Sequence, residues 1–431
     1  MLETQTLAAL EAALKALERE FAALPDVSDP ASPRLDAVLA EVVARLGDNF
    51  PYFHPLYAGQ MMKPPHPVAR AAYALATWIN PNNHALDGGR ASTPMERDAV
   101  AQIAAMFGWK EHLGHLTGGG TMANLEGLWV AGQLHPGKKI AASAQSHYTH
   151  QRISGVLQLP FTKIATDCRA RMDPQALEAQ LAAGDIGCVV ATLGTTATGS
   201  VDPLPDILAL REKYGFRLHV DAAYGGYFTL ADNLGPEARA AFDRIAEADS
   251  IVIDPHKHGL QPYGCGCVLF RDPAVGTFYK HDSPATYFSS DQLHLGEISL
   301  ECSRPGASAV ALWATMRALP LTRGGEFAQG MSACRRAATE LHRRLEQDPR
   351  FRLPFPPQLD IVVWAPKSGS ADRIFQEAAR RNLHLALARL PGVFFGDPQP
   401  EVLCLRSVLM KPEHEQWLDR IWEILDQAAN V

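Results

Sequence analysis

Three short segments of the sequence carry residue types that could hold an anionic, aromatic ligand and react with it. Residues 117–121 read Thr-Gly-Gly-Gly-Thr before a predicted helix, while Asp221 and Lys257 each follow a short apolar run. Glycines before a helix let an anion approach free backbone N–H groups. A carboxylate at a strand end can pair with a ring heteroatom, and a lysine held near the interior is a nucleophilic amine. Each segment alone has a simpler explanation, as a turn, a capping carboxylate or a solvated lysine.

The three segments together, in this order along the chain, meet the needs of pyridoxal 5′-phosphate (PLP). That cofactor requires a site for its phosphate, an anionic partner for its ring nitrogen and an amine for its aldehyde. Two more polar segments, 143–147 and 194–199, fall between the glycines and Asp221. We therefore predict a single cofactor site built from these segments.

Hydrophobic patterns predict the elements that must position these residues. From about residue 95, short apolar runs alternate with helical patterns, including helices near 171–184 and 203–214. This alternation is typical of a mostly parallel α/β sheet with helices on both faces, which binds ligands at the carboxyl ends of its strands. We expect three parts: residues 1–75, an N-terminal helix and arm; residues 76–310, a large cofactor-binding domain; and residues 311–431, a small C-terminal domain.

Composition narrows the class of protein. The 431 residues are 47% hydrophobic and 20% charged, and the net charge of −7 argues against a nucleic-acid partner. No apolar run has the length of a membrane span. The seven scattered cysteines fit reduced thiols in a cytoplasmic protein. Cys265 and Cys267 have no second cysteine or histidine pair beside them, so we expect no metal site.

The combined motifs resemble the group II PLP-dependent decarboxylases, from about His54 to about Arg406. The segments that carry the resemblance are residues 118–125, 143–150, 191–204, 219–226, 254–259 and 303–313. It implies PLP fold type I, with a seven-stranded, mostly parallel central sheet and a smaller C-terminal α+β domain. The lysine segment is most similar to those of tyrosine/aspartate decarboxylases, glutamate decarboxylases and sphingosine-phosphate lyases. A homodimer is also implied, because related sites are completed at a subunit interface.

The resemblance assigns roles to individual residues. Lys257 would form a Schiff base with the cofactor, Asp221 would bind the ring nitrogen, and His147 would stack on the ring. The other implied cofactor contacts are Gly119, Gly120 and Thr121 at the phosphate, Ala223 under the ring, Thr196 nearby, and His256 beside the lysine.

Substrate and proton-transfer residues are predicted from residue chemistry and approximate position. Arg304 and Arg406 are candidates for binding a substrate carboxylate, because the guanidinium fork is bidentate. A structural ion pair is the alternative for each. Gln60 and Met61 lie in an arm that corresponds to a substrate-pocket segment of relatives, although dimer packing also explains that arm. For the proton donor after carbon dioxide leaves, we predict His294 or Tyr287, with His294 preferred because imidazole is a common general acid. Bound water or His147 is the alternative source of this proton.

The predicted function is removal of the α-carboxylate of an L-amino acid, giving an amine and carbon dioxide. Two alternatives remain open: a carbon–carbon lyase or aminotransferase on the same scaffold, and a non-catalytic, dimeric PLP-binding protein.

Overall fold

Two β-sheets organise the chain in a computed structural model that describes residues 3–25, 32–280 and 294–430. The larger sheet has seven strands in the order β1-β7-β6-β5-β4-β2-β3. Its strands are β1 (Leu113–Thr117), β2 (Lys139–Ser143), β3 (Phe161–Ile164), β4 (Ile186–Thr192), β5 (Arg217–Asp221), β6 (Ser250–Ile253) and β7 (Gly266–Phe270). Only β7 runs against its two neighbours, so the sheet is mostly parallel, as the sequence predicts.

The register of the central strands aligns their carboxyl ends. Thr192 of β4 pairs with Asp221 of β5, which pairs in turn with Val252 of β6. The segments that follow β4, β5 and β6 therefore leave the sheet side by side, and the predicted cofactor residues lie in these segments.

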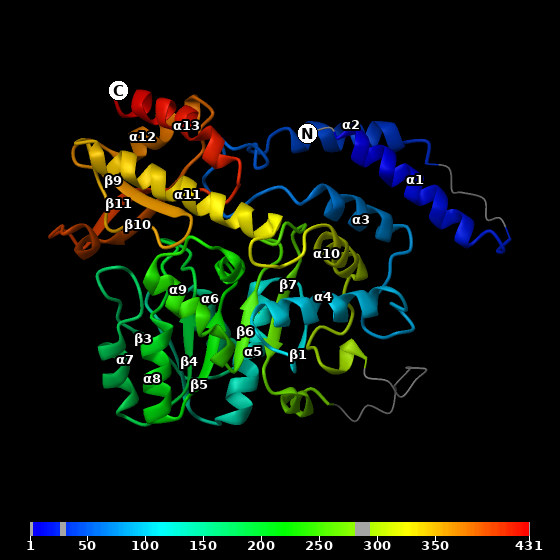
Figure 1. The fold of residues 1–431 in the computed structure, drawn as a ribbon, viewed down its shortest axis with the longest axis horizontal. Coiled ribbons are helices and arrows are strands. Elements are labelled where there is room, and N and C mark those ends of the chain that lie inside the picture. The colour runs from blue at the N-terminus through cyan, green and yellow to red at the C-terminus, as the bar shows by residue number, and fades with distance from the viewer. Residues whose placement is uncertain (1–2, 26–31, 281–293, 431) are drawn as a thin grey trace.

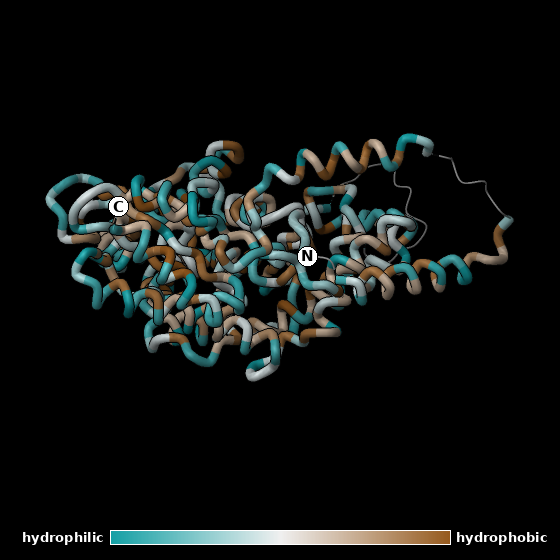
Figure 2. The backbone as a smooth tube through the Cα atoms, turned by 90° about the horizontal axis from the view of Figure 1, so that it is seen from above, coloured by the Kyte–Doolittle hydropathy of each residue, from teal (hydrophilic) through white to brown (hydrophobic). Residues whose placement is uncertain are grey.

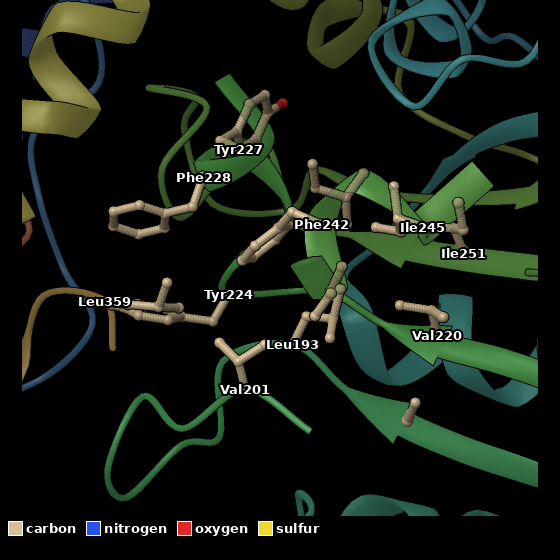
Figure 3. Packing of buried hydrophobic residues seen from close by; sticks show 14 of the residues in the cluster. Leu193, Val201, Val220, Tyr224, Tyr227, Phe228, Phe242, Ile245, Ile251 and Leu359 are labelled. Atoms are coloured by element: carbon tan, nitrogen blue, oxygen red, sulfur yellow. The ribbon is translucent and has the colours of Figure 1, made fainter. Parts of the chain in front are cut away.

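Both faces of the large sheet are buried, as expected for parallel strands covered by helices. In β4, Val189 and Ala191 join the core on one face, whereas Cys188 and Val190 join the core on the other. Figure 3 shows part of the first core, including Val220 from β5 and Phe242 from α9. The helices of this part of the chain are α3 (Pro67–Thr77), α4 (Ser92–Met106), α5 (Gly120–Leu134), α6 (Thr149–Val156), α7 (Pro174–Leu181), α8 (Leu204–Tyr214), α9 (Pro236–Asp243) and α10 (Gly306–Ala318).

The C-terminal part forms a second layer above the large sheet (Figure 1). Its four-stranded antiparallel sheet has the order β10-β11-β9-β8. The strands are β8 (Phe351–Arg352), β9 (Ile361–Pro366), β10 (Ala386–Pro391) and β11 (Glu401–Val408), and the helices are α11 (Glu326–Gln347), α12 (Ala371–Arg380) and α13 (His414–Ala429). Short 3-10 helices span Gly226–Leu230, Ile245–Glu247, Pro273–Phe278, Leu295–Glu297 and Gly392–Phe395.

The N-terminal helices α1 (Thr4–Glu20) and α2 (Leu35–Leu46) contain no buried residue. Seen from above, α2 stands away from the rest of the chain and carries hydrophobic residues along its length (Figure 2). Glu3 and Arg70 form an ion pair that ties the start of α1 to α3. Within the described ranges, no helix combines the length and apolar character needed to cross a membrane.

Candidate active site

A cavity of about 420 Å³ lies at the carboxyl ends of the central strands. The turns after β1, β2, β4, β5 and β6 all contribute to its wall. The nine residues predicted to contact the cofactor all line it: Gly119, Gly120, Thr121, His147, Thr196, Asp221, Ala223, His256 and Lys257. Residues from five strand ends, separated by up to 138 positions in sequence, thus meet in one place (257 − 119 = 138).

The glycine turn forms part of the wall of this cavity. Gly119 has φ +152° and precedes α5, whose N-terminus has no side-chain cap. A Cβ atom added to Gly120 would lie 2.7 Å from Asp254 Oδ2, so glycine is required there for close packing. The Gly118 amide donates to Glu301 Oε2 at 3.0 Å. Gly120 and Thr121, the first residues of α5, line the cavity, so this helix N-terminus can offer its dipole and free amides to an anion there.

Asp221 provides a buried negative charge in the wall of the cavity. Its Oδ1 accepts the Ala223 backbone N–H at 3.1 Å, and its Oδ2 lies 2.8 Å from His150 Nε2. Burial by itself raises the pKa of Asp221, but the hydrogen bond and charge interaction with His150, and after them the charge of Lys257, hold that pKa below its ordinary value. Asp221 is therefore ionised at neutral pH.

Lys257 places an amine in the same cavity. Its Nζ lies 2.9 Å from Asp254 Oδ2, and His256 Nε2 lies 3.5 Å from that same oxygen. The His256 ring packs on Tyr263, with centroids 4.6 Å apart. Asp254 is 2% exposed whereas the lysine side chain is 20% exposed, so a buried carboxylate holds an amine that remains open to the cavity.

His147 contributes a half-buried imidazole to the wall. Its Nδ1 lies 2.7 Å from the Thr149 hydroxyl. Desolvation lowers the pKa of His147 below its ordinary value, so the ring is largely neutral at pH 7. A neutral ring lining the cavity is suited to stacking against a flat aromatic ligand.

These features fit PLP. The uncapped glycine turn suits the phosphate, the ionised Asp221 suits a protonated ring nitrogen, and Lys257 supplies the amine. Ala223 leaves room beside the carboxylate for a flat ring.

Arg304 does not line the cavity. Its guanidinium donates to Glu96 in a buried ion pair and to the backbone carbonyls of Leu116, at 2.8 Å, and Asn83, at 3.3 Å. The substrate-binding prediction does not fit this position, because Arg304 lies outside the cavity lining and both of its terminal guanidinium nitrogens already bind Glu96 or the backbone.

Arg406 also lies outside the cavity lining but differs in its partners. Its Nη1 donates to the Gly59 carbonyl at 2.9 Å, whereas Nε and Nη2 are buried without a hydrogen-bond partner among the described residues. Tyr224, which lines the cavity, is near enough to influence the pKa of Arg406, which burial lowers. Arg406 therefore retains unsatisfied donors close to the site.

The predicted arm residues approach the edge of the site. The Met61 carbonyl accepts the Tyr263 hydroxyl at 3.0 Å, which connects the arm to the ring that packs on His256. Gln60 is exposed, and neither Gln60 nor Met61 lines the cavity.

Of the two predicted proton donors, His294 is not brought to the cavity. His294 is 1% exposed, and its Nδ1 accepts the Leu86 backbone N–H at 3.1 Å, away from the cavity lining. A buried ring turned toward the backbone does not fit the predicted donor role. Tyr287 lies outside the described residues.

Sequence reasoning missed three polar partners of the site: His150, Thr149 and Asp254. His150 and Thr149 stand in the same segment as His147, and Asp254 is three residues before Lys257. Their residue types were visible in the sequence, but their partners depend on how α6 and the turn after β6 pack.

Comparisons with known proteins agree with this geometry. The pyridoxal-dependent decarboxylase conserved domain matches residues 132–367. The L-tyrosine decarboxylase of Enterococcus faecium is 30% identical and covers 72% of this chain and 67% of that protein. A probable L-tyrosine/L-aspartate decarboxylase of Methanopyrus kandleri is 28% identical and covers 77% of this chain and 88% of that protein.

Solved structures are similar over nearly the whole chain. Oryza sativa TDC with PLP and tryptamine has a TM-score of 0.82 at 19% identity, covering 100% of this chain and 98% of that chain. Mouse CSAD has a TM-score of 0.80 at 19% identity, covering 98% of this chain and 91% of that chain. The likeness confirms the predicted fold.

Proposed function

The chain belongs to the pyridoxal-dependent decarboxylase family, and from that premise we propose that it removes the α-carboxylate of an L-amino acid with PLP held covalently by Lys257. The products are an amine and carbon dioxide. One observation carries the proposal: an amine, an ionised carboxylate and an uncapped helix N-terminus face a single cavity.

Asp221 is the group on which the rate depends most. Bound PLP supplies an electron sink for the cleaved bond, and the sink is most effective when the ring nitrogen is protonated. Unit charges about 4 Å apart attract by roughly 4 kcal/mol at an effective dielectric constant of about 20. That energy corresponds to about 3 pKa units, so an ionised Asp221 keeps a proton on a neighbouring ring nitrogen.

Asp254 positions the reactive amine, and His147 forms part of the cavity wall. Asp254 holds the Lys257 amine 2.9 Å away and offers a carboxylate to which a lysine proton can pass. His147, fixed by Thr149, closes one wall against water. These roles orient the cofactor and exclude solvent from the bond that breaks.

Arg406 is our candidate for the substrate carboxylate. Two of its guanidinium nitrogens are buried without partners, and a bidentate carboxylate would satisfy both. Arg304 is not proposed for this role, since its Nη1 already pairs with Glu96 and its Nη2 donates to the Asn83 carbonyl.

We further propose that the N-terminal residues 1–75 form dimer contacts. One side of α2 carries Leu35, Val38, Leu39, Val42 and Leu46, each between 41% and 62% exposed. An unburied apolar stripe at helical spacing is suited to a second copy of the chain. Light scattering should report a dimer for the parent protein and a monomer for Leu39→Glu, while Glu41→Lys on the same helix should remain dimeric. A monomeric parent protein would contradict this assignment.

Two assays test the reaction. The enzyme, supplied with PLP, is incubated with each common L-amino acid, and carbon dioxide and amine are measured together. At least one amino acid should give both in equal amounts. Borohydride reduction and peptide mapping should then find the cofactor on Lys257. Release of a keto acid or an aldehyde fragment without carbon dioxide would reject the decarboxylase proposal.

A further inference from the structure

His150 is the partner of Asp221, and none of the roles assigned above uses it. It is the second residue of α6, its side chain is fully buried, and its Nε2 lies 2.8 Å from Asp221 Oδ2. We propose that His150 is a positioning residue whose Nε2–H donates to Asp221 and so aims the carboxylate at the cofactor's ring nitrogen. This inference rests on the proposed function.

The surroundings of the ring determine which nitrogen carries the proton. Nε2 faces an acceptor, whereas Nδ1 is buried and has no hydrogen-bond partner among the residues that the structure describes. A proton on Nδ1 would create a buried N–H with no acceptor, which is costly. The ring nitrogen that donates to Asp221 is therefore Nε2.

Two donors fix the orientation of the carboxylate. The Ala223 amide binds Oδ1 and the His150 ring binds Oδ2, so rotation of the carboxylate about its Cβ–Cγ bond would break both contacts. The remaining lone pairs then face the cavity that Asp221 lines. With the amide alone, one oxygen would lose its anchor, and the carboxylate would be free to turn or to keep a proton itself.

The chain provides a matched control in His115. Its Nε2 lies 2.9 Å from Glu126 Oε2, and both side chains are fully buried, as in a second histidine–carboxylate pair. Neither residue lines the cavity. Loss of His115 therefore measures the general cost of removing a buried imidazole from a carboxylate, whereas loss of His150 measures that cost together with any effect on the cofactor.

The test uses PLP labelled with ¹⁵N in its ring and added to four proteins: the parent, His150→Leu, His150→Gln and His115→Leu. NMR reports whether the ring nitrogen is protonated, and a fluorescence titration reports the affinity for PLP. We expect a protonated nitrogen in the parent and in His115→Leu. His150→Leu should lose that protonation and bind PLP about tenfold or more weakly, as expected for loss of a charged hydrogen bond. His150→Gln, whose amide can replace Nε2–H, should recover most of both properties.

Two outcomes would overturn the inference, and they are distinguishable. If the parent holds a protonated ring nitrogen and His150→Leu does as well, with unchanged affinity, His150 has only a packing role and the proposed function stands. If the parent does not hold a protonated ring nitrogen, the assignment of Asp221 fails too. Should His150→Leu not fold, His150→Asn takes its place, because its shorter amide ends before Asp221; equal behaviour of the Asn and Gln variants would then reject the positioning role.

Discussion

Asp221 and Glu96 are both buried carboxylates, 5% and 1% exposed, but their surroundings differ. Glu96 accepts hydrogen bonds from Arg304, the Leu116 amide and the Asn83 side chain, so donors within the protein occupy both of its oxygens. Asp221 accepts hydrogen bonds from one backbone amide and one imidazole, and it still lines a cavity. Burial alone therefore does not identify an active-site acid; the acceptor capacity left facing a cavity does.

The sharpest test of this comparison is Asp221→Asn. The variant keeps the shape of the side chain but removes its charge. The attraction of that charge for a protonated ring nitrogen is worth roughly 4 kcal/mol. Turnover should fall about 10³-fold, with the fold retained by circular dichroism. Activity within a few-fold of the parent would reject the ring-nitrogen role.

Glu96→Gln should have the opposite effects to Asp221→Asn: a large loss of stability and little loss of turnover. Removing one partner of a buried ion pair leaves Arg304 uncompensated, so the free energy of unfolding should fall by about 3 kcal/mol. Carbon dioxide release per folded molecule should stay close to that of the parent. Chemical denaturation and an active-site titration separate the two quantities, and a turnover defect at full folding would show that Glu96 also serves the cavity.

The stability of the parent protein should depend more strongly on acidic pH than the stability of Asp221→Asn. The pKa of Asp221 is lowered in the folded protein, so its stabilising contribution is complete above the ordinary carboxyl pKa of about 3.9 and is lost as pH falls toward the folded value. Between pH 5 and pH 3, the unfolding free energy of the apo parent should therefore decrease more steeply than that of Asp221→Asn. Parallel pH curves for the two proteins would mean that the ionised side chain gains nothing on folding.

Thr149→Val should give the smallest effect, because it removes a neutral contact to His147. A hydrogen bond of this kind contributes about 1 kcal/mol, which corresponds to roughly a fivefold change in turnover. A steady-state assay at saturating substrate measures it. A loss as large as that of Asp221→Asn would show that Thr149 takes part in charge stabilisation.

The sequence predicted the residues of the cavity better than their partners. Asp221 and Lys257 stand at strand ends, where local patterns are informative. The crossover helix expected near 171–184 is α7, which begins later because Asp173 caps its N-terminus and Pro174 occupies its first turn. Such local signals can be read without a fold.

Partners distant in sequence could not be predicted in this way. His150 meets Asp221 across 71 residues, and Arg304 meets Glu96 across 208. Their pairing depends on how helices pack on the sheet. Arg304 is chemically able to bind a substrate carboxylate, but it forms a structural ion pair with Glu96 instead. His294 likewise has suitable chemistry but a ring turned toward the Leu86 amide.

The position of β7 has a consequence for the order of folding. β1 pairs with β7, so Thr117 lies opposite Gly266, and a Cβ on Gly266 would lie 2.5 Å from the Gly119 carbonyl carbon. The glycine turn thus packs against Gly266, which is synthesised almost 150 residues after Thr117 (266 − 117 = 149). Closing so long a segment is slow. A nascent chain that ends before β7 lacks this support, so we expect the protein to acquire its cofactor only after most of the large sheet has left the ribosome.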